Sequence, residues 1–158
     1  MKTLFQYNWQ VRNDWFSWCN DVSEEELLKP RVGGVGGILQ TLFHIIVVEY
    51  SWICDLKGRP DIDDDFDQHA SLARIISLSK RLHPEVRDFV YGWTDKQELQ
   101  TVNVTHPATG VSETFRHGEI LSHVIVHEIH HIGQISVWAR EIGRQPVTAN
   151  LIHRGLFE

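Results

Sequence analysis

The chain has 158 residues, of which 23% are charged and 42% are hydrophobic, a composition typical of one soluble globular domain spanning residues 1–158. Fifteen basic and 21 acidic residues give a net charge of −6 without any basic block, so we expect no nucleic-acid partner. The N-terminus lacks the pattern of a secretory signal, and two cysteines, Cys19 and Cys54, do not make a disulfide framework. We therefore expect a cytoplasmic protein.

Apolar residues at helical spacing predict four long helices along the chain. The first covers about residues 3–20, and several aromatic residues widen its apolar stripe. The second, about residues 35–57, is apolar nearly all round, although its polar residues argue against a membrane span and a membrane partner. The third covers about residues 72–93 and contains Pro84, which we expect to kink or interrupt it. The last covers about residues 117–142.

The connections between these helices are mostly short. Ser23 and Glu26 fit a capping box that begins a short helix. The segment LQTVNVTHPATGVSETFRH alternates and turns at Pro107–Gly110, which predicts a small hairpin or two extended pieces before the last helix. The fold class expected is therefore all-α, a four-helix bundle with this insertion, and its long connection allows a crossover topology.

The last helix carries the motif HEIHH at residues 127–131. His123, His127 and His131 follow one another at four-residue spacing, which places them in a staggered row on one side of a helix. His127 and His131 lie at the edge of the apolar arc, whereas His123 and His130 lie further round, toward solvent or a dimer partner. Two His residues four apart can present their ring nitrogens to one metal ion.

A third ligand must come from another helix, and His44 is the candidate. It is the only His in the most apolar predicted helix, where an imidazole without a partner would be costly to bury. Taken alone, His44 fits a core residue bonded to a carbonyl or a Glu equally well. The His pair on the last helix makes metal ligation the better interpretation.

Two other readings of HEIHH fit less well. The extended metalloprotease motif H-E-x-x-H-x-x-G-x-x-H requires Gly and His at the positions occupied by Gln134 and Val137. A di-iron carboxylate bundle requires a second E-x-x-H motif, which this chain lacks.

Several stretches resemble the DinB/YfiT-like family, in the pattern of its YizA-type members. They are FQYNWQVRNDWFSW, ILQTLFHIIVVEYSWI, HVIVHEIHHIGQ and WAREIGRQPV, and together they extend over nearly the whole chain. The resemblance implies an up-down-down-up bundle, usually a homodimer, and one divalent metal ion per chain held by His44, His127 and His131. Zn, Ni and Mn are all compatible with three imidazoles. Ile132 stands where many members have Arg, which weakens any inference of an anion or substrate contact there.

The resemblance also implies a class of activity. Characterised members are metal-dependent transferases and isomerases that use low-molecular-weight thiols such as bacillithiol, mycothiol or glutathione. We therefore expect a metal-dependent thiol S-transferase acting on an electrophilic substrate, or a related metal-assisted hydrolase or isomerase. The alternatives are a non-catalytic metal-binding dimer with a sensor or structural role and, more remotely, an HExxH metallopeptidase.

Three polar residues are candidates for supporting roles. Glu128 is expected to act as a base toward the thiol or to orient a ligand His, although a buried carboxylate bonded to a neighbouring helix fits equally well. Glu49 and Gln134 are expected to hydrogen-bond to ligand imidazoles. Both cysteines are expected in the core. Six Trp and broad apolar faces on the first and third helices suggest a symmetric dimer.

Overall fold

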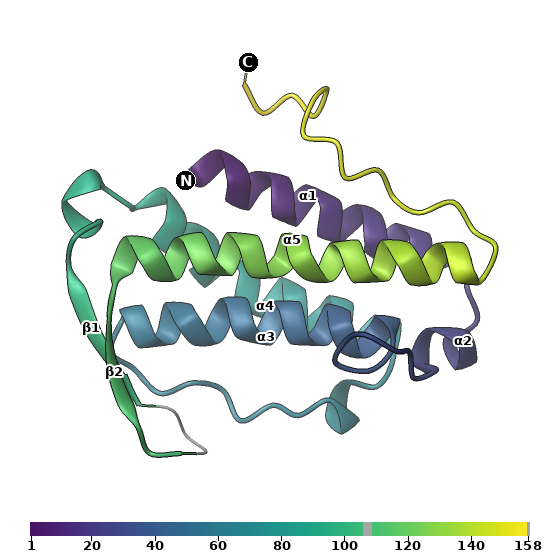
Figure 1. Cartoon of the computed structure of the whole chain (residues 1–158), viewed down its shortest axis with the longest axis horizontal. Helices are drawn as coiled ribbons and strands as arrows, with labels where there is room; N and C mark the ends of the chain where they lie inside the picture. The colour runs from purple at the N-terminus through teal and green to yellow at the C-terminus, as the bar shows by residue number, and fades with distance from the viewer. Residues whose placement is uncertain (106–108, 158) are drawn as a thin grey trace.

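The computed structural model describes residues 1–105 and 109–157 and is mostly helical (Figure 1). Its elements are α1 (Lys2–Cys19), α2 (Glu24–Leu28), α3 (Ile38–Leu56), α4 (Leu72–Tyr91), β1 (Thr101–Thr105), β2 (Ser112–Arg116) and α5 (His117–Glu141). The expected helical chain with a small hairpin before its last helix is confirmed. The turn predicted at Pro107–Gly110 lies partly outside the described residues.

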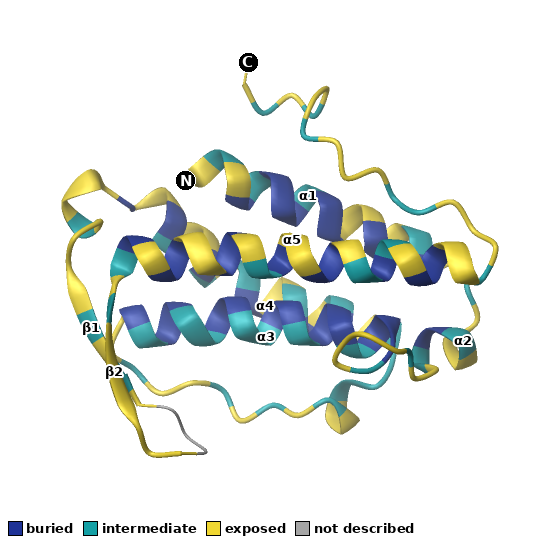
Figure 2. Ribbon diagram, viewed as in Figure 1, coloured by how far each residue is buried: buried dark blue, intermediate teal, exposed yellow. Residues whose placement is uncertain are grey.

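The four long helices lie side by side, with α1 and α3 each in contact with both α4 and α5. The loop after α3 runs back along that helix, so α4 points the same way as α3, while α1 and α5 point the opposite way (Figure 1). Buried faces turn inward and exposed residues line the outer faces (Figure 2). One core of large apolar side chains fills the interior, including Phe5, Trp15, Leu42, Ile75 and Leu121.

The helix boundaries follow from local chemistry. The Ser23 hydroxyl accepts from the Glu26 amide at the start of α2, and the Ser71 hydroxyl accepts from the Arg74 amide at the start of α4. Gly143 follows α5 with a φ of 73°, a conformation that favours glycine. Pro84 lies inside α4. Of the two outcomes expected there, a kink or an interruption, the interruption is wrong, because α4 runs on through Pro84 to Tyr91.

The hairpin packs against the helices through one of its faces. Its two strands are antiparallel, and Val102 is paired with Phe115 in their register. Both side chains are partly buried and pack against the core. The hairpin therefore forms a wall beside α3 and the beginning of α5.

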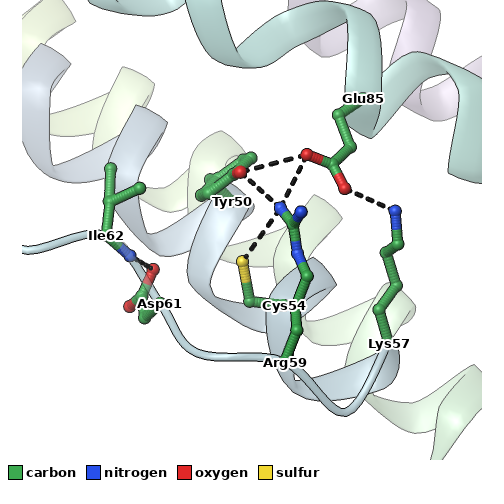
Figure 3. A network of polar contacts seen from close by, with 7 residues as sticks. All are labelled: Tyr50, Cys54, Lys57, Arg59, Asp61, Ile62 and Glu85. Atoms are coloured by element: carbon green, nitrogen blue, oxygen red, sulfur yellow. Dashed lines mark hydrogen bonds and ion pairs between the residues drawn. The ribbon is translucent and has the colours of Figure 1, made fainter.

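A polar network fixes the end of α3 to α4 (Figure 3). The Arg59 guanidinium donates to Glu85 at 2.6 Å and to the Cys54 sulfur at 3.4 Å, and it also contacts the Tyr50 hydroxyl. Lys57 contacts the same carboxylate. Cys54 and Cys19 are both buried, free thiols, and burial raises the pKa of both, that of Cys19 to about 12. Neither thiol is therefore placed or ionised as a nucleophile would need to be.

Helix α3 is long and apolar enough to cross a membrane by length and composition alone. However, 61% of its most apolar 18-residue stretch is buried inside the protein, as expected for the central helix of a soluble domain.

Candidate metal centre

Three imidazoles converge between α3 and α5. The Nε2 atoms of His44 and His127 lie 3.0 Å apart, and those of His127 and His131 lie 3.1 Å apart. All three possible ligand atoms are within 4.8 Å of one another. The cluster joins one residue of the second long helix to two residues of the last.

The local geometry follows from the sequence. Residues four apart on a helix lie on the same side, so His127 and His131 project together from α5. The adjacent α3 brings His44 to the same point, with its ring centroid 4.9 Å from each of the other two. Zinc at 2.0–2.1 Å from tetrahedrally arranged nitrogens would hold them about 3.4 Å apart, so the observed spacing fits such an ion after a small expansion.

The electrostatics of the cluster also fit a cation. Burial, reinforced by His131, lowers the pKa of His44 from 6.5 to about 4. Burial and the surrounding imidazoles lower the pKa of His127 from 6.5 to about 3. The pKa of His131 is lowered too, mainly by burial. The three rings are therefore neutral at pH 7, and the ring nitrogens that converge can offer lone pairs to a divalent ion.

Gln134 hydrogen-bonds to the His131 ring at the nitrogen that does not face the other imidazoles. Its Oε1 accepts from Nδ1 of His131 at 2.7 Å, which leaves the Nε2 of that ring as the lone-pair atom facing the other imidazoles. Its Nε2 donates to the Gly33 carbonyl at 2.5 Å. The glycine-rich loop of residues 31–37 therefore fixes the side-chain amide of Gln134, and this amide in turn orients the His131 ring.

The same loop approaches α5 closely. The Trp138 indole donates to the Val32 carbonyl at 3.1 Å. A Cβ added at Gly34 would lie 2.6 Å from the Trp138 ring and 3.2 Å from the Gln134 Oε1, so only glycine fits there without a shift. The sequence of this segment gives no sign that it supports a ligand.

The structure does not bring Glu128 or Glu49 to the imidazoles. Both Glu128 oxygens accept from Arg12, at 2.9 and 2.6 Å. Glu49 accepts from Arg12 and from the Trp9 indole, each at 2.9 Å. Glu49 is therefore bonded to Arg12 and Trp9 and not to a ligand imidazole, and Glu128 follows the alternative given for it, a buried carboxylate bonded to a neighbouring helix.

The reason is helix phase. Residue 128 is about 100° around α5 from residue 127, which turns Glu128 into the core while His127 faces the gap beside α3. Arg12, Glu49 and Glu128 are each at most 4% exposed, so the guanidinium is what makes the burial of two carboxylates tolerable. Arg12 was not recognised from the sequence. Its position within the apolar stripe of the first predicted helix was the available signal.

Two further His residues of α5, His123 and His130, are exposed. His123 lies one turn before His127, with ring centroids 5.8 Å apart, and His130 stands 3.2 Å from the Gln134 amide nitrogen. Trp52 of α3, which the sequence analysis did not single out, packs edge-on to His123 at 5.8 Å. His123 and Trp52 thus form an aromatic surface beside the imidazole cluster.

The chain belongs to the DinB family, whose sequence profile matches residues 1–154. Family membership and the three-His cluster together fit a metal-binding DinB-like protein. A relative in Bacillus subtilis (strain 168), described as uncharacterized protein YizA, is 49% identical over 156 residues. That similarity covers 99% of this chain and 96% of the relative.

Proposed function

We propose that this protein is a metal-dependent transferase that joins a low-molecular-weight thiol to an electrophile. The observation that carries the proposal is the convergence of three neutral imidazole nitrogens on one point, from His44, His127 and His131. Three protein ligands leave a further coordination position for a reactant, which is typical of catalytic rather than structural metal sites. Zn, Ni and Mn all suit such a donor set, with one ion per chain.

When bound, a divalent cation lowers the pKa of a thiol that reaches its remaining coordination position and so favours the nucleophilic thiolate. The chain supplies the ligands and their orientation. His131 is buried and held by Gln134, while His44 and His127 are half-buried, so the cluster can be reached from one side. In the transfer, a sulfur–carbon bond forms, the leaving group departs with its electron pair, and the thiol proton passes to water.

Glu128 is unsuited to accept that proton because it is 1% exposed and both of its oxygens are bonded to Arg12. The same contacts weigh against an HExxH metallopeptidase, in which this Glu would be the general base. A second candidate, a non-catalytic metal-binding dimer, shares the metal site and differs only in lacking turnover.

Metal content tests the ligand assignment. We expect about one divalent ion in the purified protein, and a similar loss of metal in His44→Ala, His127→Ala and His131→Ala. His153→Ala is the matched control, because His153 is exposed in the C-terminal segment, and it should retain the metal. Circular dichroism confirms that each variant is folded. Full metal content in folded His44→Ala would refute the three-His site.

Conjugation assays separate the catalyst from the passive binder. Bacillithiol, mycothiol and glutathione are each paired with a panel of alkylating and arylating electrophiles. Metal-loaded protein should accelerate at least one pair, whereas metal-free protein and His131→Ala should not. No metal-dependent rate across the panel would favour the non-catalytic dimer. Peptide cleavage that is lost on chelation and restored by metal would favour the peptidase.

A further inference from the structure

Two adjoining cavities lie where the hairpin meets α3 and α5. One has a volume of about 260 Å³ and the other about 400 Å³, and Trp52 and Phe115 line both. We call this region the aromatic groove and define it by Trp52 of α3, Phe115 of β2 and His123 of α5. Each cavity approaches or falls within the size range of sites for small organic molecules.

His123 lies between the aromatic groove and the imidazole cluster, although none of the three cluster residues lines either cavity. The His123 ring lies 5.8 Å from the rings of both His127 and Trp52. Trp52 in turn meets Phe115 edge-to-face, with ring centroids 6.1 Å apart and an interplanar angle of 89°. A molecule seated against these rings would therefore end about one helical turn from the nitrogens of the cluster.

The charged residues that line the aromatic groove are all acidic. Glu119 lines the smaller cavity, and Asp55 and Glu113 line the larger one. None of these three carboxylates forms an ion pair within residues 1–105 and 109–157, and no Lys or Arg of that part of the chain lines either cavity. Burial, assisted by Asp61, raises the pKa of Asp55, as expected for a carboxyl with no cation beside it.

We infer that the aromatic groove binds the electrophilic substrate, and that this substrate has an apolar or aromatic body carrying a cationic ammonium group. The inference rests on the proposed function, because it names the substrate class of that same site. The Trp52 face attracts cations through its π-system, and the three carboxylates add attraction of the same sign. An anionic substrate would meet three negative groups there.

The charges also orient the substrate. A divalent cation at the cluster repels an ammonium group, whereas the carboxylates of Asp55 and Glu113 attract it at the far part of the groove. The cationic end therefore points away from His127, and the reactive end points toward it. This arrangement separates the group that gives specificity from the group that reacts.

Binding of simple probes to the metal-free protein tests the inference. Benzyltrimethylammonium, benzyl alcohol and phenylacetate share a phenyl ring and differ in charge. The six indole N–H signals in a ¹⁵N-resolved spectrum report binding, and the signal missing from Trp52→Phe identifies Trp52. We expect the cation to shift the Trp52 signal and to bind about tenfold more tightly than phenylacetate. Equal affinities, or shifts that spare Trp52, would overturn the inference.

Variants of the acidic residues test whether these residues bind the cationic group. Replacing both exposed acids, Glu113→Gln with Glu119→Gln, should weaken benzyltrimethylammonium binding about fivefold and leave benzyl alcohol binding unchanged. Glu25→Gln, at an exposed acid on α2, is the matched control and should change neither. An unchanged affinity for the cation in the double variant would contradict the assignment.

The two proposals can fail separately. If the protein binds metal and conjugates thiols but the groove does not prefer the cation, only the substrate class is wrong. If the groove binds the cation but the protein neither holds metal nor conjugates thiols, the groove remains a cation site and the proposed transferase function is wrong.

Discussion

Arg12 determines where two of the acidic residues considered for the site lie. It bonds to Glu49 and to Glu128 across three helices, and all three residues are buried. The charge cluster they form is separate from the imidazoles, although His127 and Glu128 are neighbours in sequence. Its role follows from burial: one guanidinium compensates for two carboxylates that the core could not otherwise hold.

Substitutions in this cluster should have unequal effects on stability. Arg12→Met leaves two buried carboxylates without a cation, and we expect a loss of about 3–5 kcal/mol in the free energy of unfolding. Glu128→Gln leaves Arg12 paired with Glu49, so the loss should be smaller, about 1–3 kcal/mol. Urea denaturation of the metal-free proteins measures both. Glu128→Gln should also keep the wild-type metal content, and loss of metal from the folded variant would contradict the placement of Glu128 outside the site.

The buried imidazoles predict how stability depends on pH. The pKa values of His44 and His127 fall from 6.5 to about 4 and about 3 on folding. Below pH 6.5 the unfolded chain therefore takes up protons that the folded chain does not. This lowers the free energy of unfolding as pH falls from 6.5 toward 4, whereas the contribution is fully favourable above 6.5.

Urea midpoints of the metal-free protein at several pH values test this dependence. His127→Asn removes one of these groups, so its midpoint should fall less between pH 6.5 and pH 4 than that of the wild type. An equally steep fall in the variant would show that other groups are responsible.

For single residues, the sequence predicted the imidazole cluster but not the buried ion pairs of Arg12. The spacing of His127 and His131, and the isolation of His44 in an apolar helix, brought forward three residues that the structure places together. The pairing of Glu128 with Arg12 spans 116 residues and depends on the rotation of two helices about their axes. Spacing along one helix carries no such information.

The loop of residues 31–37 is bound to helix α5 by hydrogen bonds. The loop accepts hydrogen bonds from Gln134 and Trp138, and Gly34 allows the close approach that these bonds require. The role of this glycine-rich segment could not be predicted, because nothing in its own sequence reveals a partner about 100 residues later. In contrast, the long helices were predicted with nearly their observed bounds, since each carries its own apolar pattern and end signals.

Gly34→Ala should therefore weaken metal binding without touching a ligand. The added methyl would clash with Trp138 and push the loop away, which frees Gln134 and loosens His131. Partners that hold a metal-binding His typically change affinity by about 10–100-fold, and we expect a loss in that range. Competition with a chromogenic chelator measures it. Gly133→Ala is the control, because an added Cβ there has open space; it should leave metal affinity unchanged and stabilise α5 by about 0.5–1 kcal/mol.

In the whole molecule, the Trp residues give no reason to expect a dimer. Four of the six Trp are buried within one chain and the other two pack against its core, so their number does not require a partner. Exposed apolar residues instead follow one side of α5, at Val126, Ile129 and Val137, spaced at about one or two helical turns. A second copy of the chain seated on this side would bury them by symmetric contact.

We expect a homodimer in solution that uses this side of α5. Light scattering at micromolar concentration should give twice the mass of the 18.3 kDa chain, and Ile129→Lys should give the single-chain mass. Lys at Leu99, which is exposed on the hairpin side, is the matched control and should leave the mass unchanged. A single-chain mass for the unaltered protein would refute the dimer.

The buried charge cluster also constrains the order in which the chain can fold as it is made. Arg12 leaves the ribosome 116 residues before Glu128, an interval of roughly 6–23 s at typical rates of synthesis. The synthesis of α1, α3 and α4 is completed during that interval, yet the side of their shared core that receives α5 stays open to water. Arg12 can meet Glu49 early, and the docking of α5 then brings the second carboxylate and two of the three imidazoles into place together. Closure of the interior and assembly of the metal centre are thus one late event, and an ion can be captured by all three rings only after nearly the full chain has been synthesised.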